Sequence, residues 1–171
     1  MTYSGSIATP VGVLAVHSDG VAITRVTWPR VGCSASPAPG SPQDTERDPL
    51  LAEALAQLSA YFAGARSDFD LPFDLGPQPD VTNAVLHVLY DTVGHGETVT
   101  YGELAERSGT AVPARAIGSI MGANPIPIIV PCHRVVASDG LGGYSGGGPG
   151  EGLLTKRWLL EHEGALPAAL F

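Results

Sequence analysis

The chain has 171 residues, 44% of them hydrophobic, so it can bury a core without disulfide bonds or a structural metal. Its formal net charge is −8, and neither half is basic: residues 1–80 carry four arginines against nine acidic residues, and residues 81–171 carry five basic against eight acidic residues. A broad basic surface for nucleic acid is therefore excluded, and any such contact must depend on a few local groups.

The cysteines and the apolar runs bear on the compartment. Cys33 and Cys132 lie far apart and do not form a disulfide framework, and no charged and apolar leader precedes Ile7. No apolar run approaches the roughly 20 residues of a membrane helix. We therefore expect a cytoplasmic protein without membrane contact. Because the chain has no CxxC motif or His/Cys cluster, we also expect no metal.

The first 79 residues have the pattern of a small α/β unit. The apolar segments 12–16 and 21–28 flank Asp19-Gly20, which predicts a β-hairpin. The polar stretch 33–49 favours a surface loop, and the apolar spacing of 50–62 predicts a core helix that ends at Gly64. Residues 69–75 alternate and favour an edge strand, since Pro72 excludes a central place.

The segment Gly76-Pro77-Gln78-Pro79 is typical of a linker, which predicts two domains, 1–79 and 80–171. Beyond it, Asp80 is expected to be the N-cap of a helix that ends before Gly94. Thr100 and Glu103 fit a capping box, which predicts a short helix that ends at Gly109.

Pro113 suits the first turn of a further helix that runs to about Met121, which completes helix-turn-helix spacing. An αα-hairpin without a ligand has the same spacing. The second helix has one long polar side chain, Arg115, among small residues: Ala114, Ala116, Gly118, Ser119, Gly122 and Ala123. Such a thin helix can enter a minor groove only about 6 Å wide, or it can pack tightly on another helix.

The β-branched segment 126–136 contains Cys132. Its two prolines argue against a central strand and favour a rigid extended loop. His133 and Arg134 are candidates for favouring the thiolate, although adjacent residues on an extended chain point to opposite sides. A buried, inert cysteine is the alternative.

After the cysteine, a glycine-rich loop spans 140–150 and fits neither a P-loop nor a dinucleotide fingerprint. The last predicted helix spans 153–162 and ends at Gly164, with Leu154, Trp158 and Glu161 on one side.

The segment Pro-Cys-His-Arg-Val at 131–135 is the most specific motif, and with it the chain resembles the O6-alkylguanine-DNA alkyltransferases, also called methylated-DNA-protein-cysteine methyltransferases. The resemblance covers nearly the whole length through residues 9–12, 61–64, 69–72, 101–105, 114–118, 124–125, 143–147, 158–160 and 162–164. It implies an α+β protein: an N-terminal ribonuclease H-like α/β roll, followed by a mostly helical C-terminal domain with a winged-helix-like helix-turn-helix.

The resemblance also implies residue roles. Cys132 would accept the alkyl group, His133 would act as a base through water, and Glu163 would orient His133. Tyr101 would help to rotate the nucleotide out and donate a proton to the leaving base, while Asn124 would brace the cysteine loop.

The same resemblance implies a DNA surface and a base pocket. Arg115 would fill the vacated stack, and the DNA surface would comprise Tyr101, Ala114, Arg115, Ala116 and Ser119. The pocket for the base would be lined by Met121, Val135, Tyr144 and Ser145.

The implied activity is repair by direct reversal of damage. A monomer would bind alkylated double-stranded DNA in the minor groove, flip the base, and transfer the alkyl group of O6-alkylguanine, and of O4-alkylthymine, irreversibly to its own cysteine. Such a suicide transferase needs no cofactor and no protein partner. One departure from the family pattern is a glycine-rich loop that is longer around residues 148–152.

Three other functions fit parts of the pattern. They are a lesion-binding protein that does not transfer, a thiol hydrolase that uses Cys132 and His133, and a transcriptional regulator that uses the helix-turn-helix. Methyl transfer to Cys132, ester turnover and sequence-specific binding of undamaged duplex would discriminate among them.

Overall fold

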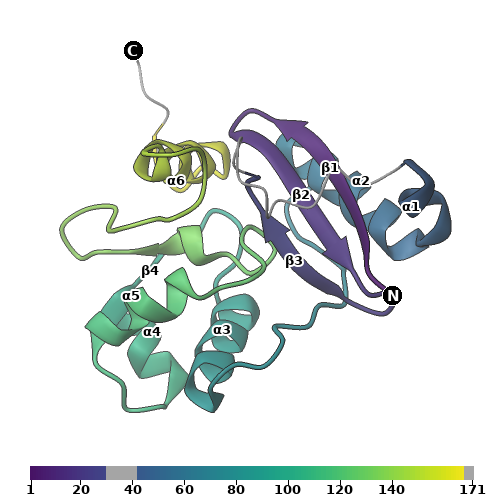
Figure 1. Ribbon diagram of the computed structural model, residues 1–171. Coiled ribbons are helices and arrows are strands. Elements are labelled where there is room, and N and C mark those ends of the chain that lie inside the picture. Colours follow the sequence, from purple (N-terminus) through teal and green to yellow (C-terminus); the bar gives the residue numbers. More distant parts are fainter. Residues whose placement is uncertain (30–41, 168–171) are drawn as a thin grey trace.

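The structure is a computed structural model that describes residues 1–29 and 42–167, so Cys33 and most of the predicted loop lie outside the described residues. The fold is mixed α+β (Figure 1). A three-stranded antiparallel sheet of order β1-β2-β3 forms the N-terminal part, and helices dominate from residue 80 onward. The division of the chain into domains 1–79 and 80–171 stays a prediction.

The predicted hairpin is confirmed. Strands β2 (Gly12–Ser18) and β3 (Ile23–Thr27) pair antiparallel, and Asp19 accepts hydrogen bonds from the amides of Val21 and Ala22 in the turn. A further strand, β1 (Tyr3–Thr9), pairs with β2 along its whole length. The sequence analysis missed β1 because its sequence, YSGSIAT, lacks a clear apolar alternation.

Helix α2 (Pro49–Phe62) confirms the predicted core helix, and the side chain of Asp48 caps it by accepting from the amide of Leu50. The prediction of a loop up to residue 49 was wrong for its last part, since α1 (Pro42–Arg47) is a short helix. The Asp44 carboxylate of α1 accepts a hydrogen bond of 3.2 Å from the amide of Ser4 in β1. This contact with β1 stabilises α1, although the polar sequence of the segment alone favours a loop.

The predicted edge strand 69–75 was wrong except at one point. Phe73 forms a single parallel bridge with Ile23, through hydrogen bonds from the Ile23 amide to the Pro72 carbonyl (2.8 Å) and from the Asp74 amide to the Ile23 carbonyl (2.9 Å). Pro72 has no amide hydrogen to donate, so the ladder does not extend.

The C-terminal part contains α3 (Asp80–Thr92), β4 (Val99–Thr100), α4 (Tyr101–Ser108), α5 (Ala114–Gly122), the 3-10 helix η1 (Cys132–Arg134), β5 (Val135–Val136) and α6 (Gly152–His162). The Thr100–Glu103 capping box is confirmed, as is the left-handed Gly109 (φ 65°) after α4. The predicted N-cap of α3 was wrong by one residue, because Pro79 occupies the cap position and Asp80 begins the helix.

Helix α6 confirms the predicted last helix, which begins one residue earlier, at Gly152. Leu154 is 70% exposed and Trp158 is only partly buried, whereas Thr155, Lys156, Leu159 and Leu160 are buried. Part of the buried side of α6 is therefore polar.

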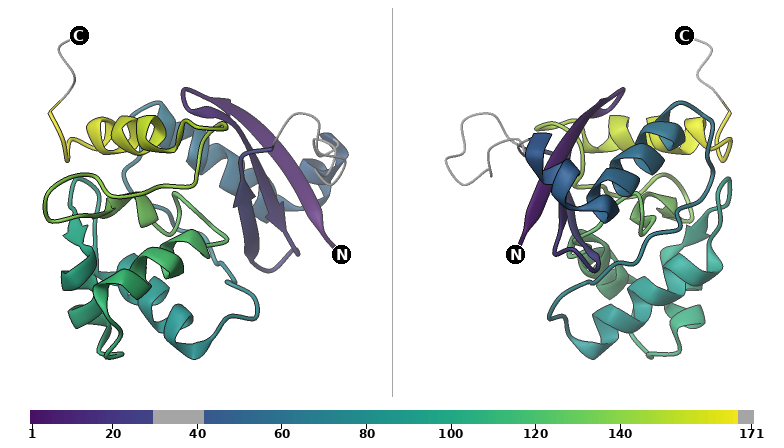
Figure 2. Two further views of the ribbon diagram at one scale, coloured as in Figure 1. Left: turned by 60° about the vertical axis from the view of Figure 1, so that its left-hand side comes forward. Right: turned by 90° about the vertical axis from the view of Figure 1, so that its right-hand side faces the viewer.

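The two parts share one hydrophobic core that runs from Leu14 in β2 to Leu159 in α6. Strand β3 lies beside the segment that leads to the cysteine, through a hydrogen bond of 3.0 Å from the Val26 amide to the Pro125 carbonyl. In Figures 1 and 2, α3, α4 and α5 gather on one side of the molecule and the sheet with α1 and α2 on the other. Within the described ranges, no helix is both long and apolar enough to cross a membrane.

Candidate active site

The loop that carries the cysteine is pinned by Asn124. Its side-chain nitrogen donates to the Val130 carbonyl (2.9 Å), and its side-chain oxygen accepts from the Ile126 amide (3.0 Å). Between these points Ile128 has a positive φ of 74°, which is strained for a β-branched residue. The loop then enters η1 at Cys132. Asn124 thus holds both ends of a strained segment that places the thiol.

Cys132 is a free thiol with 7% of its surface exposed. Burial raises its pKa, against the opposing effects of a hydrogen bond with the Asn124 side chain and the positive charge of Lys156. A thiol with a raised pKa is protonated at neutral pH, so any reaction as a nucleophile needs a base that removes the proton.

A buried network suited to that task surrounds Glu163. The carboxylate oxygen Oε1 lies 2.7 Å from His133 Nε2 and accepts hydrogen bonds from Tyr61 (2.7 Å) and from Arg134 Nη2 (3.0 Å). Oε2 accepts from Arg134 Nε at 2.8 Å. Although burial alone would raise the pKa of Glu163, the hydrogen bonds and charges of His133 and Arg134 hold it well below its usual value. Glu163 is therefore ionised.

The ionised carboxylate fixes the tautomer of His133. Because Glu163 can only accept, Nε2 of His133 carries the proton and Nδ1 keeps a free lone pair. Nδ1 is buried and has no hydrogen-bond partner within the described part of the chain. Burial lowers the pKa of His133, outweighing the raising effect of Glu163, so the imidazole is neutral and able to accept a proton.

The position of Arg134 in the sequence suggested that its charge favours the thiolate of Cys132, but its partner is Glu163. Its guanidinium binds both oxygens of Glu163 and donates to the Val93 carbonyl at 2.9 Å. The positive charge of Arg134 therefore compensates Glu163, which lets His133 remain neutral beside a carboxylate.

Lys156 is a site residue that sequence reasoning missed. It is fully buried, and its Nζ donates to the carbonyls of Val135 (2.6 Å) and Gly143 (3.0 Å) while lying 5.8 Å from the centre of the Tyr101 ring. Burial lowers its pKa to about 8. The available signal was its singularity, since it is the only lysine in the chain.

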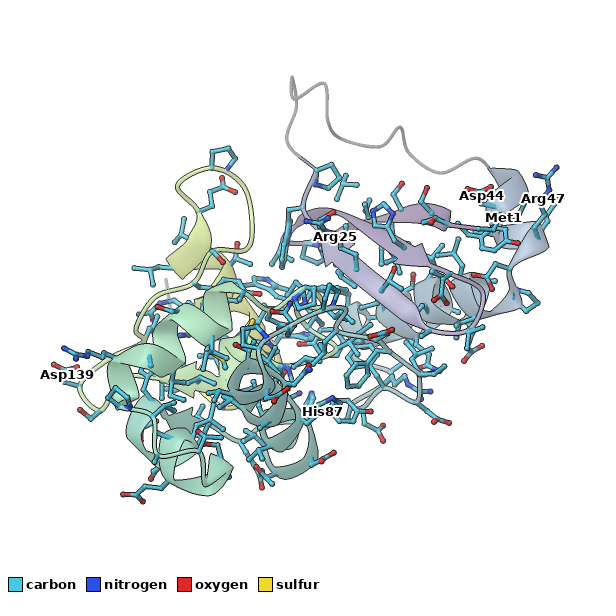
Figure 3. All side chains as sticks on the ribbon, turned by 60° about the horizontal axis from the view of Figure 1, so that its bottom comes forward. Met1, Arg25, Asp44, Arg47, His87 and Asp139 are labelled. Atoms are coloured by element: carbon cyan, nitrogen blue, oxygen red, sulfur yellow. The ribbon has the colours of Figure 1, made fainter. Side chains whose placement is uncertain are left out.

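Two cavities meet at the thiol. The larger, about 380 Å³, is lined by Tyr101, Gly118, Met121, Gly122, Cys132, Gly143, Tyr144 and Ser145. The smaller, about 190 Å³, shares Cys132, Met121, Tyr144 and Ser145 and extends to Asn124 and to residues 25–28 at the end of β3. Arg25, labelled in Figure 3, marks the end of the sheet that faces the C-terminal helices. Met1 and the α1 residues Asp44 and Arg47 lie toward the opposite end of the sheet.

Most of the predicted pocket residues thus come together. Met121, Tyr144 and Ser145 line both cavities with Cys132. Val135 is different: it is fully buried and lines neither cavity, and its carbonyl is occupied by Lys156. Any contribution of Val135 to the pocket therefore passes through Lys156.

The predicted DNA surface lies on α5 beside the larger cavity. Ala114, Arg115 and Ser119 are exposed and Ala116 is half-buried, while Ile117 and Ile120 turn into the core. Arg115 has no hydrogen-bond or ion-pair partner among residues 1–29 and 42–167. Gly118 and Gly122 of the same helix line the larger cavity, so the exposed face of α5 borders the opening that leads to Cys132. In the described ranges, no cluster of three His, Cys, Asp or Glu side chains could hold a metal ion.

Fold and site together define an α+β protein in which a helix-turn-helix borders a cavity that ends at a buried cysteine. The family model of the 6-O-methylguanine DNA methyltransferase ribonuclease-like domain matches residues 2–75. The model of the 6-O-methylguanine DNA methyltransferase DNA binding domain matches residues 80–165. The chain therefore belongs to the 6-O-methylguanine DNA methyltransferase family, which confirms the predicted family and α+β fold class.

Individual relatives agree. The methylated-DNA-protein-cysteine methyltransferase of Mycobacterium bovis is 37% identical over 172 residues, covering 95% of this chain and 93% of that protein. The mouse protein of the same name is 44% identical over 120 residues, covering 67% of this chain but only 55% of the mouse protein.

Solved structures are similar as well. The O6-methylguanine methyltransferase of Mycobacterium tuberculosis superposes with a TM-score of 0.79 at 37% identity, covering 99% of this chain and 98% of that one. The structure of Mycobacterium tuberculosis OGT in complex with DNA superposes with a TM-score of 0.77 at 37% identity, covering 95% and 92%.

Proposed function

We propose that this protein repairs alkylated DNA by moving the alkyl group from O6 of guanine, and from O4 of thymine, to Cys132. The observation that carries the proposal is the position of Cys132 where two cavities meet, beside a neutral histidine held by an ionised glutamate. The likeness to an OGT solved in complex with DNA supports duplex DNA as the partner.

Helix α5 docks in the minor groove in this proposal. Its small exposed residues Ala114 and Ser119, with the half-buried Ala116, allow close approach, and the exposed guanidinium of Arg115 enters the base stack. Tyr101 lies at the start of α4 beside the larger cavity. Because the net charge is −8, affinity depends on this local fit rather than on a basic surface.

The target nucleotide must leave the stack, because a base inside the duplex cannot reach a thiol that is 7% exposed. The larger cavity takes the flipped base between Met121, Tyr144 and Ser145, and the smaller one takes the alkyl group beyond the sulfur. Insertion of Arg115 offsets part of the unstacking cost, which is about a few kcal/mol.

The transfer is a displacement at carbon. His133 Nδ1 takes the thiol proton of Cys132 through one bridging water, and the sulfur attacks the alkyl carbon. The bond between this carbon and O6 breaks as the new carbon–sulfur bond forms, and the leaving guanine takes a proton from the hydroxyl of Tyr101. Glu163 stabilises the imidazolium through Nε2 while Asn124 holds the cysteine loop in place.

The product is a thioether, which has no labile bond to water, so each chain acts once and no cofactor takes part. We also place the protein in the cytoplasm as a monomer composed of domains 1–79 and 80–171. A thiol that must stay reduced supports a reducing compartment.

The deciding experiment is intact-protein mass spectrometry after mixing with excess duplex that contains one O6-methylguanine. The protein should gain the mass of one methylene, once per chain, at Cys132, and gain nothing from undamaged duplex or in the Cys132→Ala variant. If wild type binds the lesion but gains no mass, the protein is a damage sensor and the transferase proposal is wrong.

A further inference from the structure

We infer that Tyr61 is a positioning residue of the proton relay, supplied from the N-terminal part of the chain to the carboxylate that holds His133. Tyr61 lies near the end of α2, and its hydroxyl donates a 2.7 Å hydrogen bond to Glu163 Oε1 across a separation of 102 residues. The inference rests on the proposed transfer to Cys132, whose base is His133.

The ring of Tyr61 alone would be explained by packing. It is fully buried, with ring-centre distances of 5.0 Å to Phe62, 5.4 Å to Phe69 and 5.2 Å to His162. A phenylalanine would fill the same space without a buried polar group that must find a partner. The hydroxyl therefore needs its own explanation, and its partner is the carboxylate that also receives His133.

Oxygen Oε1 of Glu163 is shared by three donors, Tyr61, His133 and Arg134. Burial and the negative charge of Glu163 raise the pKa of Tyr61 well above its usual range, so the hydroxyl stays a donor. Each donor withdraws charge from the oxygen. Without Tyr61 the carboxylate would stabilise the imidazolium of His133 more strongly, and His133 would become protonated at a higher pH.

The other charged and titratable groups around His133 stay in place when this hydroxyl is removed. Arg134 and Lys156 disfavour the imidazolium, and the Cys132 thiol is the next residue along the chain. The backbone of Tyr61 also contributes, since its carbonyl lies 2.7 Å from His162 Nε2. Tyr61, near the end of α2, thus contacts two consecutive residues, His162 and Glu163, at the C-terminal end of α6.

The test is the Tyr61→Phe variant, followed by single-turnover reaction with free O6-benzylguanine between pH 5.5 and 8.5, which avoids any effect on DNA binding. The acid limb of the pH–rate profile should move upward by about half a pH unit or more. The rate should fall about threefold on the acid limb and differ by less than about twofold at pH 8. A deficit of equal size at every pH would mean that the hydroxyl is merely structural and would overturn the inference.

Two further variants sharpen the result. Tyr90→Phe is a matched control, because the Tyr90 hydroxyl also joins the two parts, donating to the Phe69 carbonyl at 3.3 Å, but does not contact Glu163. Its pH profile should match wild type. In a Glu163→Gln background, Tyr61→Phe should change the rate by less than about twofold at any pH, because the carboxylate through which Tyr61 acts on His133 is absent.

The outcomes separate the two proposals. Failure of wild type to become alkylated would reject the proposed function itself. Normal alkylation of wild type with an unshifted Tyr61→Phe profile, or with a full additional effect in the Glu163→Gln background, would reject only the role of Tyr61.

Discussion

Lys156 and Gly143 are joined by a 3.0 Å hydrogen bond from the lysine Nζ in α6 to the glycine carbonyl in the glycine-rich loop. The same Nζ donates to Val135 at 2.6 Å, and the Gly143 amide donates to the Tyr101 hydroxyl at 3.3 Å. One buried ammonium therefore ties strand β5 to the glycine-rich loop, whose Gly143 forms a wall of the larger cavity together with Tyr101.

Replacing Lys156 by Met should keep the length of the side chain but remove the donor from the buried Val135 carbonyl, at a cost of about 1–3 kcal/mol, and from the carbonyl of the exposed Gly143. We expect transfer to slow about tenfold or more, with duplex and with free O6-benzylguanine alike, because the wall serves both substrates. Single-turnover rates measure this. Arg157→Met, at the exposed neighbouring position, is the control; a Lys156→Met rate within twofold of that control would argue against the wall.

The Arg115→Ala variant should separate DNA handling from chemistry. Because Arg115 is exposed on α5 and has no partner among the described residues, its removal should slow repair of O6-methylguanine in duplex about tenfold, or about 1.4 kcal/mol, while reaction with the free base changes less than about twofold. The control is Arg107→Ala on the neighbouring helix α4, which changes the net charge equally. Equal losses with both substrates would remove Arg115 from the DNA surface.

Glu163 makes stability depend on pH in a defined direction. Its pKa in the folded protein is well below the unfolded value of about 4.3, so its contribution is fully present above that pH and is lost as pH falls further. Glu163→Gln should therefore cost about 3 kcal/mol at pH 7 and progressively less between about pH 5 and pH 2. Urea unfolding at several pH values measures the difference. The exposed Glu106→Gln should stay within about 0.5 kcal/mol throughout; a Glu163→Gln difference that is independent of pH would contradict the assigned ion pair.

Gly152 closes the longer loop against the base pocket. A Cβ at this position would collide with the backbone carbonyl oxygen of Tyr144, which cannot move as a side-chain end can. Gly152→Ala should therefore lower the free energy of unfolding by about 1–3 kcal/mol and slow transfer of the benzyl group more than that of methyl. Gly140→Ala is the control, since nothing lies within 4 Å of its added Cβ. Wild-type behaviour of Gly152→Ala in both assays would show that the loop end is free to shift.

Several local signals predicted elements correctly, whereas elements that depend on long-range contacts were missed. The Thr100–Glu103 box acts within three residues, so a local pattern predicts it. By contrast, β1 is defined by its partner β2, and α1 by its contact with β1. Neither partner is visible in the residues of the element itself.

The residues of the candidate site can also be divided into those that the sequence predicted and those that it did not. The motif around Cys132 and the family resemblance pointed to His133, Glu163 and Asn124; His133 and Glu163 are hydrogen-bonded to each other, and Asn124 binds the loop that carries Cys132. Tyr61 lies in a segment of the resemblance and Lys156 is the only lysine, but neither was predicted as a site residue, because each matters through one polar atom that reaches a partner far along the chain.

The burial of Lys156 also limits which groups of the folded protein can react with reagents in solution. Lys156 is the only lysine in the chain and is 0% exposed. In the folded protein, therefore, no lysine amine is open to amine-directed reagents. Acylation of Lys156 requires the glycine-rich loop to move away from Nζ, so the acylation rate measures how often the cavity opens.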